Sequence, residues 1–465
     1  MNSSAGTPDS LPGYVSRRRF LQGSSLVTAA TLLPLPAILG ARGAEPLPIR
    51  IGLIGCGGRG TGAVLDALGA ATLVNYPSAG YHTEDVAAGA AVQNKDLQVV
   101  ALCDVFRDRI NSCRENLKKV GVNIADDMCF DGFDGYQKLL AVPEINYVIH
   151  ATNPHFRPLH VKAAVTAGKN VFMEKPGAVD SPGVRTLLEA YEIAIQKNLG
   201  IAAGTQRRHR PSYVETVKRI QDGEIGEIEC LRCYWNGGVI WVIEKTDAMS
   251  DMEWQLRNWN YFTWTGGDHI VEQHVHNLDV GNWVMGGHPT RATGLGGRQV
   301  RTDPAYGHIY DHFAVQYEYE GGKTVTSMCR QIDGCDNRVE EVVHGSEGKC
   351  VTSSGRAMIE GKVNWKFDGQ NPNPYMVEHK DLVDAIRNGP YLNEGQRVAE
   401  STLTAIMGRM SAYSGKTLTW DQALNSSMDL MPPPEQLALG SIPTPPVAMP
   451  GKTPLPPPIK EGRVN

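Results

Sequence analysis

The fold of the first domain is decided by residues 51–60, which read Ile51-Gly52-Leu53-Ile54-Gly55-Cys56-Gly57-Gly58-Arg59-Gly60. A buried apolar run followed by this glycine spacing is typical of the first strand and turn of a Rossmann unit. Gly55 permits the tight turn, Gly57 lets the backbone approach a pyrophosphate, and Gly60 allows close packing of the helix. The helix N-terminus then faces the anion, so the stretch predicts a dinucleotide site.

Further apolar strands alternate with helical stretches after this turn, as in a parallel sheet that is covered on both faces. The strands expected in this sheet are residues 49–54, 99–103, 147–151, 170–172 and 201–203. Residues 70–96 form a longer connection than usual, with a loop at 76–81, and are interpreted as an insertion.

The second strand ends in an acid, Asp104, at the position where a carboxylate can accept hydrogen bonds from an adenosine ribose. This acid favours NAD over NADP, although Arg107 nearby leaves NADP open. Asp104 could alternatively cap the following helix.

The sequence pattern changes beyond about residue 225. Strands with aromatic residues and alternating polarity are expected at 228–235, 313–319 and 323–330. Two late helices are predicted at 375–388 and 394–414, and the proline-rich tail 431–458 is expected to be an extended arm. The predicted domains are a signal segment at 1–44, a Rossmann domain at 45–178, an α/β domain at 179–430 and a tail at 431–465. The late helices could pack back on the Rossmann domain.

The composition is that of a soluble globular protein, with 41% hydrophobic residues, 20% charged residues and a net charge of -5. Such a surface disfavours nucleic acid, and no later apolar run is long enough for a stable membrane insertion. The nine cysteines show no Cys-x-x-Cys spacing, and Cys56, Cys103 and Cys230 are interpreted as small core residues.

The N-terminal region contains a pattern typical of an export signal. Residues 16–21 read Ser16-Arg17-Arg18-Arg19-Phe20-Leu21, as in a twin-arginine signal. The apolar run 26–39 is interrupted by Pro34 and Pro36, which is typical of a signal segment and not of a membrane span. We therefore expect a periplasmic or otherwise exported protein. Since free nicotinamide cofactor is scarce outside the inner membrane, its cofactor should be tightly bound.

A second motif, Glu174-Lys175-Pro176, follows the strand expected at 170–172. It lies at the carboxyl edge of the sheet, where open α/β folds bind their ligands. Lys175 there could bond both a substrate hydroxyl and the cofactor ribose, and its charge would favour loss of the hydroxyl proton. The alternative is a solvated Glu–Lys pair before a turn proline.

A third motif spans residues 266–279, in which a continuous helix would place Glu272, His276 and Asp279 on one face. Neutral imidazole is a suitable base for an alcohol near pH 7, and the acid could orient it or bind another hydroxyl. Two other interpretations stay open, namely ordinary helix-cap polarity and a metal site. No metal is expected, since the spacing of Asp268, His269, His274 and His276 matches no recognised zinc site.

Aromatic residues crowd the region before this motif, and aromatic faces suit the apolar faces of sugars. Ordinary packing is the alternative for any one of them, and the residues concerned are Trp235, Trp241, Trp254, Trp259, Tyr261 and Trp264.

Residues 307–319 are predicted to form a strand with two unlike faces. The apolar face carries Ile309, Phe313, Val315 and Tyr317, and the polar face carries His308, Tyr310, His312 and Gln316. We expect the polar face to meet a ligand or another subunit, with the tail helping to clasp the oligomer.

In this order the three motifs resemble the Gfo/Idh/MocA family, the group of glucose–fructose oxidoreductase and inositol dehydrogenase, over about residues 49–414. The resemblance implies an α/β protein with an N-terminal Rossmann parallel sheet, a C-terminal domain with an open mixed sheet used for oligomerisation, and an active site between them. Lys175 matches the family lysine and His276 the family acid/base histidine. Glu272 stands where aspartate is usual and His274 where glycine is common, which concerns substrate shape more than reaction type.

The resemblance also places residues 151–155 at the nicotinamide side and residues 204–207 in the loop after the next strand. The catalytic residues expected are Lys175, His276 and Glu272. The cofactor-binding residues expected are Gly55, Gly57, Gly58, Arg59, Gly60, Asp104, Thr152, Asn153, His155, Glu174, Lys175 and Gln206.

These features predict an oxidoreductase that moves hydride between a sugar or polyol hydroxyl and a tightly bound NAD, in a homo-oligomer, either dimer or tetramer. Some members of the family are glycosidases that oxidise a sugar transiently, and this is the first alternative. The second alternative is a noncatalytic sugar-binding protein that kept the fold.

Overall fold

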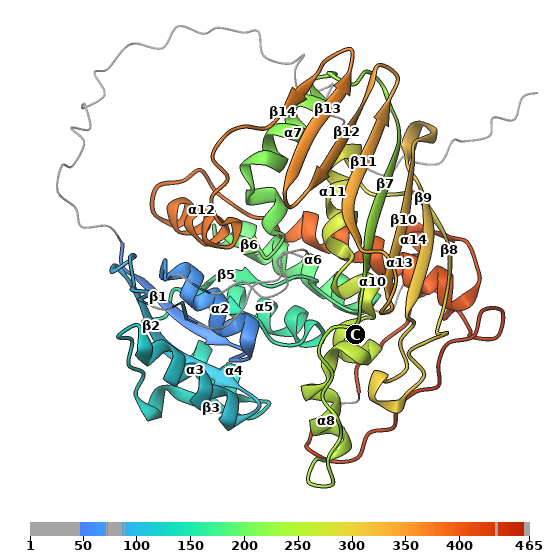
Figure 1. The fold of residues 1–465 in the computed structure, drawn as a ribbon. Helices are drawn as coiled ribbons and strands as arrows, with labels where there is room; N and C mark the ends of the chain where they lie inside the picture. Colours follow the sequence, from blue (N-terminus) through green and yellow to red (C-terminus); the bar gives the residue numbers. More distant parts are fainter. Residues whose placement is uncertain (1–46, 71, 73–85, 88, 433–435, 460–465) are drawn as a thin grey trace, which may run out of the picture. The chain divides into compact units, whose positions relative to one another are not determined.

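The computed structural model describes residues 47–70, 72, 86–87, 89–432 and 436–459 (Figure 1). The described residues belong to one compact unit that contains two sheets. The predicted signal segment and the loop expected at 76–81 lie outside the described residues.

The first sheet has six parallel strands in the order β3-β2-β1-β4-β5-β6. Its strands are β1 Ile49–Ile54, β2 Leu97–Asp104, β3 Cys129–Asp131, β4 Tyr147–His150, β5 Asn170–Met173 and β6 Ile201–Ala203. All five predicted strands are present, whereas the three-residue edge strand β3 was missed because it is too short to show a pattern. Since β6 completes this sheet, the sheet extends past the domain boundary predicted at residue 178.

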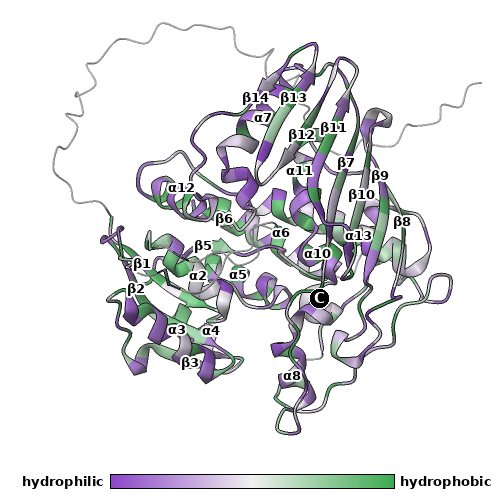
Figure 2. Cartoon of the chain, in the orientation of Figure 1, coloured by the Kyte–Doolittle hydropathy of each residue, from purple (hydrophilic) through white to green (hydrophobic). Residues whose placement is uncertain are grey.

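Helices cover both faces of the parallel sheet, whose strands are largely hydrophobic (Figure 2). One core cluster joins β1 to α2, α3 and the late helix α12, and the other contains buried side chains of α4, α5 and α6. The helices are α2 Gly58–Ala67, α3 Arg107–Lys119, α4 Gly135–Leu140, α5 Arg157–Thr166, α6 Ser181–Gln196 and α12 Pro374–Asn388.

The second sheet has nine strands in the order β14-β13-β12-β11-β7-β10-β9-β8-β15. It is mixed, because β10 runs parallel to β7 and the other pairs are antiparallel. A parallel sheet followed by a mixed sheet confirms the predicted fold class. The strands are β7 Ile228–Gly237, β8 Arg291–Gly297, β9 His312–Glu318, β10 Thr324–Gln331, β11 Arg338–Gly345, β12 Gly348–Ser353, β13 Arg356–Gly361, β14 Trp365–Lys366 and β15 Leu418–Thr419.

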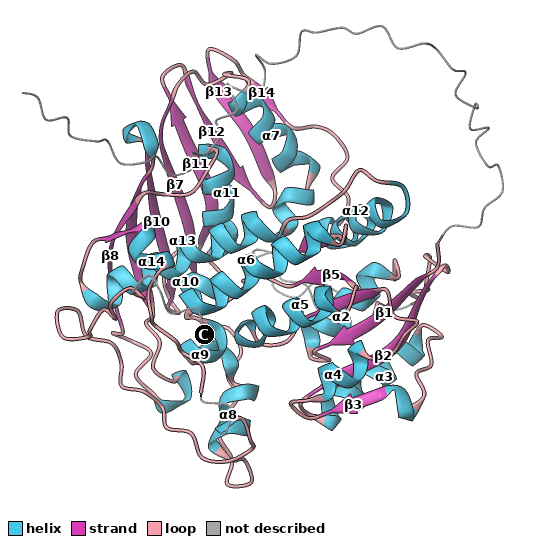
Figure 3. Ribbon diagram, turned by 180° about the vertical axis from the view of Figure 1, so that it is seen from behind, coloured by secondary structure: helices cyan, strands magenta, loops and turns pink. Residues whose placement is uncertain are grey.

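Helices lie against one face of the mixed sheet, as Figure 3 shows from behind. The contacting helices are α7 Pro211–Gln221, α11 Val275–Met285 and α13 Gly395–Ser414, with α14 Trp420–Leu424 beside α13. Phe313, Val315 and Tyr317 of β9 are buried in the core on this side, whereas Gln316 is exposed. The predicted alternation is therefore observed from residue 312 onward.

The same alternation does not extend back to residue 307. His308 is buried and its Nε2 lies 2.8 Å from the Thr263 hydroxyl. Tyr310 is buried as well, and its hydroxyl donates to the Ala448 carbonyl at 3.0 Å. The predicted polar face thus loses these two members, because the chain before β9 lies inside the molecule.

Residues 238–262 lead from β7 to the short helix α9 Thr263–Gly266, and they include α8 Asp251–Arg257. We call residues 238–262 the cover segment. Its side chains share a hydrophobic cluster with loops of the parallel sheet and with Ile442 of the tail. Met252 donates its backbone N–H to Gly440 at 3.0 Å, and the Gln255 side chain donates to Ile442 at 3.2 Å.

Most of the described tail, 436–459, is neither helix nor strand, apart from an isolated bridge between Pro458 and Ser426, which agrees with the predicted extended arm. All nine cysteines are free, with Cys56 and Cys103 buried as predicted and Cys230 only half-buried. Among the described residues, no helix combines the length and apolar character needed to cross a bilayer.

Candidate active site

The glycine turn after β1 is shaped by close backbone approach. Gly55 has a φ of +101°, and a Cβ there would lie 2.5 Å from the backbone nitrogen of Thr152. A Cβ on Gly60 would lie 1.8 Å from the Gly55 carbonyl oxygen, so any larger residue at this position would clash with the turn. Helix α2 begins at Gly58 with no side-chain cap, which leaves its first N–H groups to bind an anion.

Asp104 lies at the end of β2, and both of its oxygens accept backbone hydrogen bonds. Oδ2 accepts from Cys56 at 2.8 Å and Oδ1 from Phe106 at 2.9 Å. Each oxygen keeps a second lone pair, and Asp104 lines the main pocket. The carboxylate therefore organises the loop and still faces the place where a ribose would lie.

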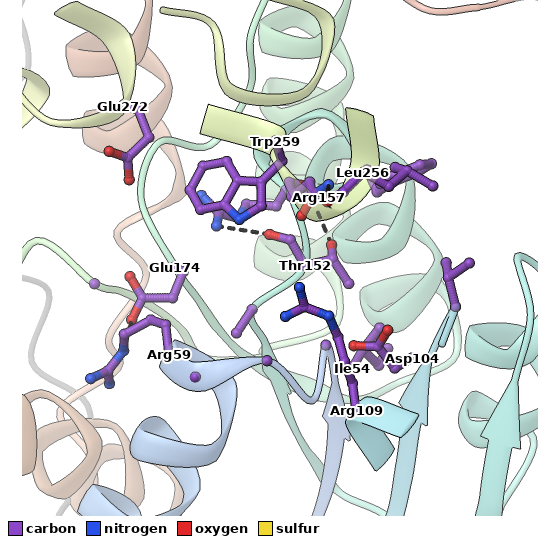
Figure 4. A pocket seen from close by; sticks show the side chains of 18 of the residues that line it. Ile54, Arg59, Asp104, Arg109, Thr152, Arg157, Glu174, Leu256, Trp259 and Glu272 are labelled. Carbon is purple, nitrogen blue, oxygen red and sulfur yellow. Dashed lines mark hydrogen bonds and ion pairs between the residues drawn. The ribbon is translucent and has the colours of Figure 1, made fainter. Parts of the chain in front are cut away.

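The basic residue beside Asp104 is Arg109 and not Arg107. Arg107 is turned toward the Cys129 carbonyl, at 3.0 Å, and toward Asp126. Arg109 lines the pocket, and its guanidinium NH1 lies 2.7 Å from where a Gly57 Cβ would be (Figure 4). The cation available to a nucleotide is thus Arg109, two residues after the arginine that the sequence singled out.

The main pocket has a volume of about 510 Å³ and runs from the glycine turn to the third motif. It gathers most of the predicted site residues, namely Gly55, Gly57, Gly58, Arg59, Asp104, Thr152, Asn153, Glu174, Lys175, Gln206, Glu272 and His276. Gly60 and His155 are not among the lining residues. His155 is instead buried edge-on against Phe156 and Trp264.

Lys175 and Glu272 form an ion pair inside this pocket. Lys175 Nζ lies 2.7 Å from Glu272 Oε1 and donates to the Glu272 carbonyl at 2.6 Å. The two side chains are only 12% and 5% exposed, so the pair is held in a partly desolvated environment. This contact joins the second motif to the third across 97 residues, which excludes the solvated Glu–Lys alternative for Lys175.

Glu174 points the other way, toward the first helix. Its Oε1 accepts from Arg59 Nε at 2.7 Å, and Arg59 also bonds Asp66 at 3.2 Å. A Cβ on Gly204 would lie 2.4 Å from Glu174 Oε2, so a larger residue there would push the carboxylate aside. Glu174 and Arg59 therefore fix the wall of the pocket between α2 and β5.

His276 is buried, lines the pocket and stacks on Trp235, with ring centroids 5.7 Å apart. Burial, reinforced by the charge of Lys175, lowers the pKa of His276 well below its usual range. The imidazole is consequently neutral at physiological pH and able to accept a proton.

The continuous helix that would place Glu272, His276 and Asp279 on one face is not present. α10 His269–Glu272 ends before Gln273, and α11 begins at Val275. Glu272 and His276 still reach the same pocket, but Asp279 does not. It accepts from Arg208 Nε at 2.8 Å and from the Ser401 hydroxyl at 2.7 Å.

The remaining polar groups of the third motif hold the fold together. Asp268 has a φ of +75° and accepts from the Tyr310 N–H at 2.9 Å and from the Tyr413 hydroxyl. His274 Nε2 lies 2.7 Å from the Ser327 hydroxyl. Within the described residues, no three His, Cys, Asp or Glu side chains are arranged to hold a metal ion.

A buried carboxylate behind His276 was not foreseen. Glu341 of β11 accepts hydrogen bonds from the Asn277 amide at 2.6 Å, the Tyr213 hydroxyl at 3.1 Å and the Thr352 hydroxyl at 2.8 Å, and it pairs with Arg207. The Arg207 guanidinium in turn lies 5.8 Å from the centre of the Trp235 ring. This network fixes the start of α11 and the aromatic neighbour of His276.

Arg157 was also missed, because its partners are backbone carbonyls that leave no sequence signature. It donates to the Thr152 carbonyl at 2.9 Å (Figure 4). It also donates to the Pro176 carbonyl at 2.6 Å, so it joins the loop at residues 151–155 to the second motif. Burial lowers the pKa of its guanidinium to about 10.

The residues present fit a nicotinamide dinucleotide. The glycine cradle would be filled by a single Cβ at Gly55 or Gly60, the uncapped helix offers N–H groups to a pyrophosphate, and Asp104 faces the pocket.

Comparison with known proteins agrees with this geometry. Residues 78–201 match the model of the oxidoreductase family with an NAD-binding Rossmann fold, and residues 213–351 match the Gfo/Idh/MocA C-terminal domain. The inositol 2-dehydrogenase of Pseudomonas syringae pv. syringae is 30% identical over 302 residues, which is 63% of this chain and 79% of that protein.

Two further similarities are more distant. The 2,7-anhydro-N-acetylneuraminate hydratase of Escherichia coli is 26% identical over 209 residues, 44% of this chain and 51% of that protein. The structure of levoglucosan dehydrogenase in complex with NADH and levoglucosan covers 80% of this chain and 100% of its own, with a TM-score of 0.60 and 16% identity, which is a likeness of fold. From its motifs, its two sheets and these matches, the chain belongs to the Gfo/Idh/MocA family of NAD-binding oxidoreductases.

Proposed function

We propose that this oxidoreductase removes hydride from a secondary hydroxyl of a sugar or polyol, with Lys175, Glu272 and His276 as the groups that handle the substrate. The observation that carries the proposal is the meeting of the Lys175–Glu272 ion pair and the neutral His276 in one pocket with the glycine turn. A relative named inositol 2-dehydrogenase supports a polyhydroxylated substrate.

The chain's residues divide the work as follows. Bound nicotinamide supplies the hydride acceptor. Lys175 donates a hydrogen bond to the reacting hydroxyl, and its positive charge favours the developing alkoxide. The neutral imidazole of His276 takes up the hydroxyl proton. Glu272 holds Lys175 in place and can accept a hydrogen bond from a neighbouring hydroxyl.

We propose NAD as the cofactor, because the carboxylate of Asp104 would repel a 2′-phosphate on the ribose. Tight retention is supported by the cover segment. Arg257 lines the pocket and makes a two-bond ion pair with Asp108 of α3, at 2.9 and 3.1 Å. Its guanidinium also lies 4.0 Å from the centre of the Phe106 ring, so the segment is fastened to the loop that follows β2.

The twin-arginine pattern at residues 16–21 supports export of the folded, loaded protein, and an exported enzyme cannot exchange its cofactor freely. We therefore propose a closed cycle in which a second carbonyl compound reoxidises the bound nucleotide. We further propose a homo-oligomer, with the exposed face of the mixed sheet as the surface between subunits.

A redox-neutral reaction is the second candidate, favoured by the relative that is named a hydratase. In that case the same pocket would oxidise a sugar only transiently and release a product without an acceptor.

One experiment separates these functions. The nucleotide released from denatured, purified protein is identified by mass spectrometry, and the intact protein is then incubated with sugars, polyols and glycosides with and without a carbonyl acceptor. The proposal expects bound NAD(H) and a keto product formed in step with acceptor reduction. Free sugar released from a glycoside without acceptor would indicate the second candidate. Absence of nucleotide, together with no turnover on added NAD or NADP, would contradict both.

A further inference from the structure

The structure sorts the crowded aromatic residues of the sequence into two groups. Trp254, Tyr261 and Trp264 are buried in the hydrophobic cluster beneath the cover segment. Trp241 and Trp259 are half-buried, and both line the pocket. In Figure 4 the indole of Trp259 faces the pocket beside Arg157 and Thr152.

The same two groups differ in their hydrogen bonds. Trp254 Nε1 donates to the Ile243 carbonyl at 2.7 Å, and Trp264 Nε1 donates to Gln255 Oε1 at 2.7 Å. In the described part of the chain, no protein group accepts from the indole N–H of Trp241 or Trp259. Because Trp241 and Trp259 are half-buried and line the pocket, each keeps a π-face and an indole N–H donor for a group inside it.

The backbone that carries the two indoles is held in place. The Tyr261 hydroxyl donates to the Trp241 carbonyl at 2.9 Å. Two residues further, Ile243 donates its N–H to Asn258 Oδ1 at 2.9 Å. These hydrogen bonds fix the backbone near Trp241 and Trp259. The two indole rings have centroids 5.7 Å apart and an interplanar angle of 56°.

This pair is separate from the aromatic surface at the reacting end. Trp235 belongs to β7 and stacks on His276 at 5.7 Å. No ring contact among the described residues joins Trp235 to Trp241 or Trp259, although all three line the same pocket. The pocket thus offers two aromatic surfaces, one beside the proton acceptor and one on the cover segment.

We propose that Trp241 and Trp259 form a subsite for a second sugar ring, so that the preferred substrates are glycosides or disaccharides and not free monosaccharides. The ring that is oxidised lies by Trp235 and His276, and the attached ring stacks on the cover-segment pair and accepts from its indole N–H groups. This inference rests on the proposed carbohydrate function and adds the size class of the substrate.

The test uses the full, nucleotide-loaded protein and compares cellobiose, maltose and lactose with glucose and galactose. Trp241→Ala and Trp259→Ala are expected to lower the preference for a disaccharide, measured as the ratio of kcat/KM values, about tenfold, which corresponds to about 1.4 kcal/mol. Trp259→Phe keeps an aromatic face and should lose less. Saturation-transfer NMR on the same proteins should show weaker contact with the second ring only.

Trp365→Ala is the matched control, because Trp365 is a half-buried tryptophan of β14 that lies under Arg219, outside this pocket. An unchanged preference in both alanine variants, or a loss of bound nucleotide in place of disaccharide contact, would overturn the subsite. If no sugar is oxidised by the parent protein, the proposed function fails. Tryptophan-dependent disaccharide contact in the NMR experiment would still support the subsite in that case.

Discussion

At the scale of single residues, the proposed chemistry depends on keeping the imidazole of His276 neutral. Burial and the neighbouring Lys175 lower the pKa of this group. The ring should therefore stay unprotonated, and able to take a proton from the substrate, well into the acid range. We expect kcat/KM to fall with decreasing pH only below about 6.5, the ordinary histidine value, as His276 becomes protonated. His276→Ala should lower turnover roughly a hundredfold and retain nucleotide. An acid limb above pH 7, or near-normal activity of the variant, would contradict this role.

A second histidine should set the stability of the protein at high pH. His209 Nδ1 lies 2.7 Å from Asp381 and its Nε2 lies 3.3 Å from Glu394. Although burial opposes it, bonding to these acids raises the pKa of His209 to about 9. Its stabilisation is therefore complete below about pH 6.5 and is lost as the pH rises through 9.

The variant His209→Gln tests this in thermal unfolding. The melting temperature should lie clearly below that of the parent protein at pH 6, and the difference should shrink toward zero at pH 9.5. A difference that is the same at both pH values would show that the ring acts through packing and not through its charge.

At the scale of elements, helix α8 contacts the edge of the nucleotide pocket through its last residue, Arg257. Arg257 joins α8 to Asp108 by two hydrogen bonds and covers Phe106, at the edge of the nucleotide pocket. Arg257→Ala should speed nucleotide loss about five- to tenfold, because a partly exposed ion pair and a cation–π contact each contribute on the order of 0.5–1 kcal/mol. Nucleotide fluorescence after dilution into nucleotide-free buffer measures the rate.

Arg219→Ala provides the control for α8, since Arg219 also makes ion pairs and covers a ring, that of Trp365, away from the nucleotide pocket. Equal rates of nucleotide loss in Arg257→Ala and the parent protein would mean that the cover segment does not retain the cofactor.

At the scale of the whole molecule, the tail connects parts that are distant in the sequence. Ile442 is buried in the cluster under the cover segment, and Ser441 bonds Asp251 at 2.8 Å. A chain that ends at residue 430 should therefore unfold at lower temperature and lose nucleotide faster, because α8 loses its support. A chain that ends at residue 459 is the control. If the shortened chain instead keeps its stability but forms smaller oligomers in light scattering, the tail serves the contact between subunits.

Much of this site is local in the sequence and was accessible from it. The strand, glycine turn and helix at residues 49–67 were predicted from the spacing of the glycines, and the contact of Gly60 with the Gly55 carbonyl lies inside this strand–turn–helix unit. Lys175, Glu272 and His276 were likewise identified, since each follows a recognisable strand or lies in a helical motif.

Other features were decided only by the tertiary structure. Arg109 replaced Arg107 beside Asp104, because the partners of Arg107 lie on β3 and the preceding turn, an edge too short to predict. Asp279 lies outside the pocket and pairs with Arg208, because the helix is interrupted at Gln273. His155 is buried against Trp264, which is more than a hundred residues away in the sequence. Which tryptophans face the pocket depended on the tail and on Tyr261 holding the cover segment. Spacing determines local geometry, whereas contacts across a hundred residues or more depend on how the two sheets and the tail pack together.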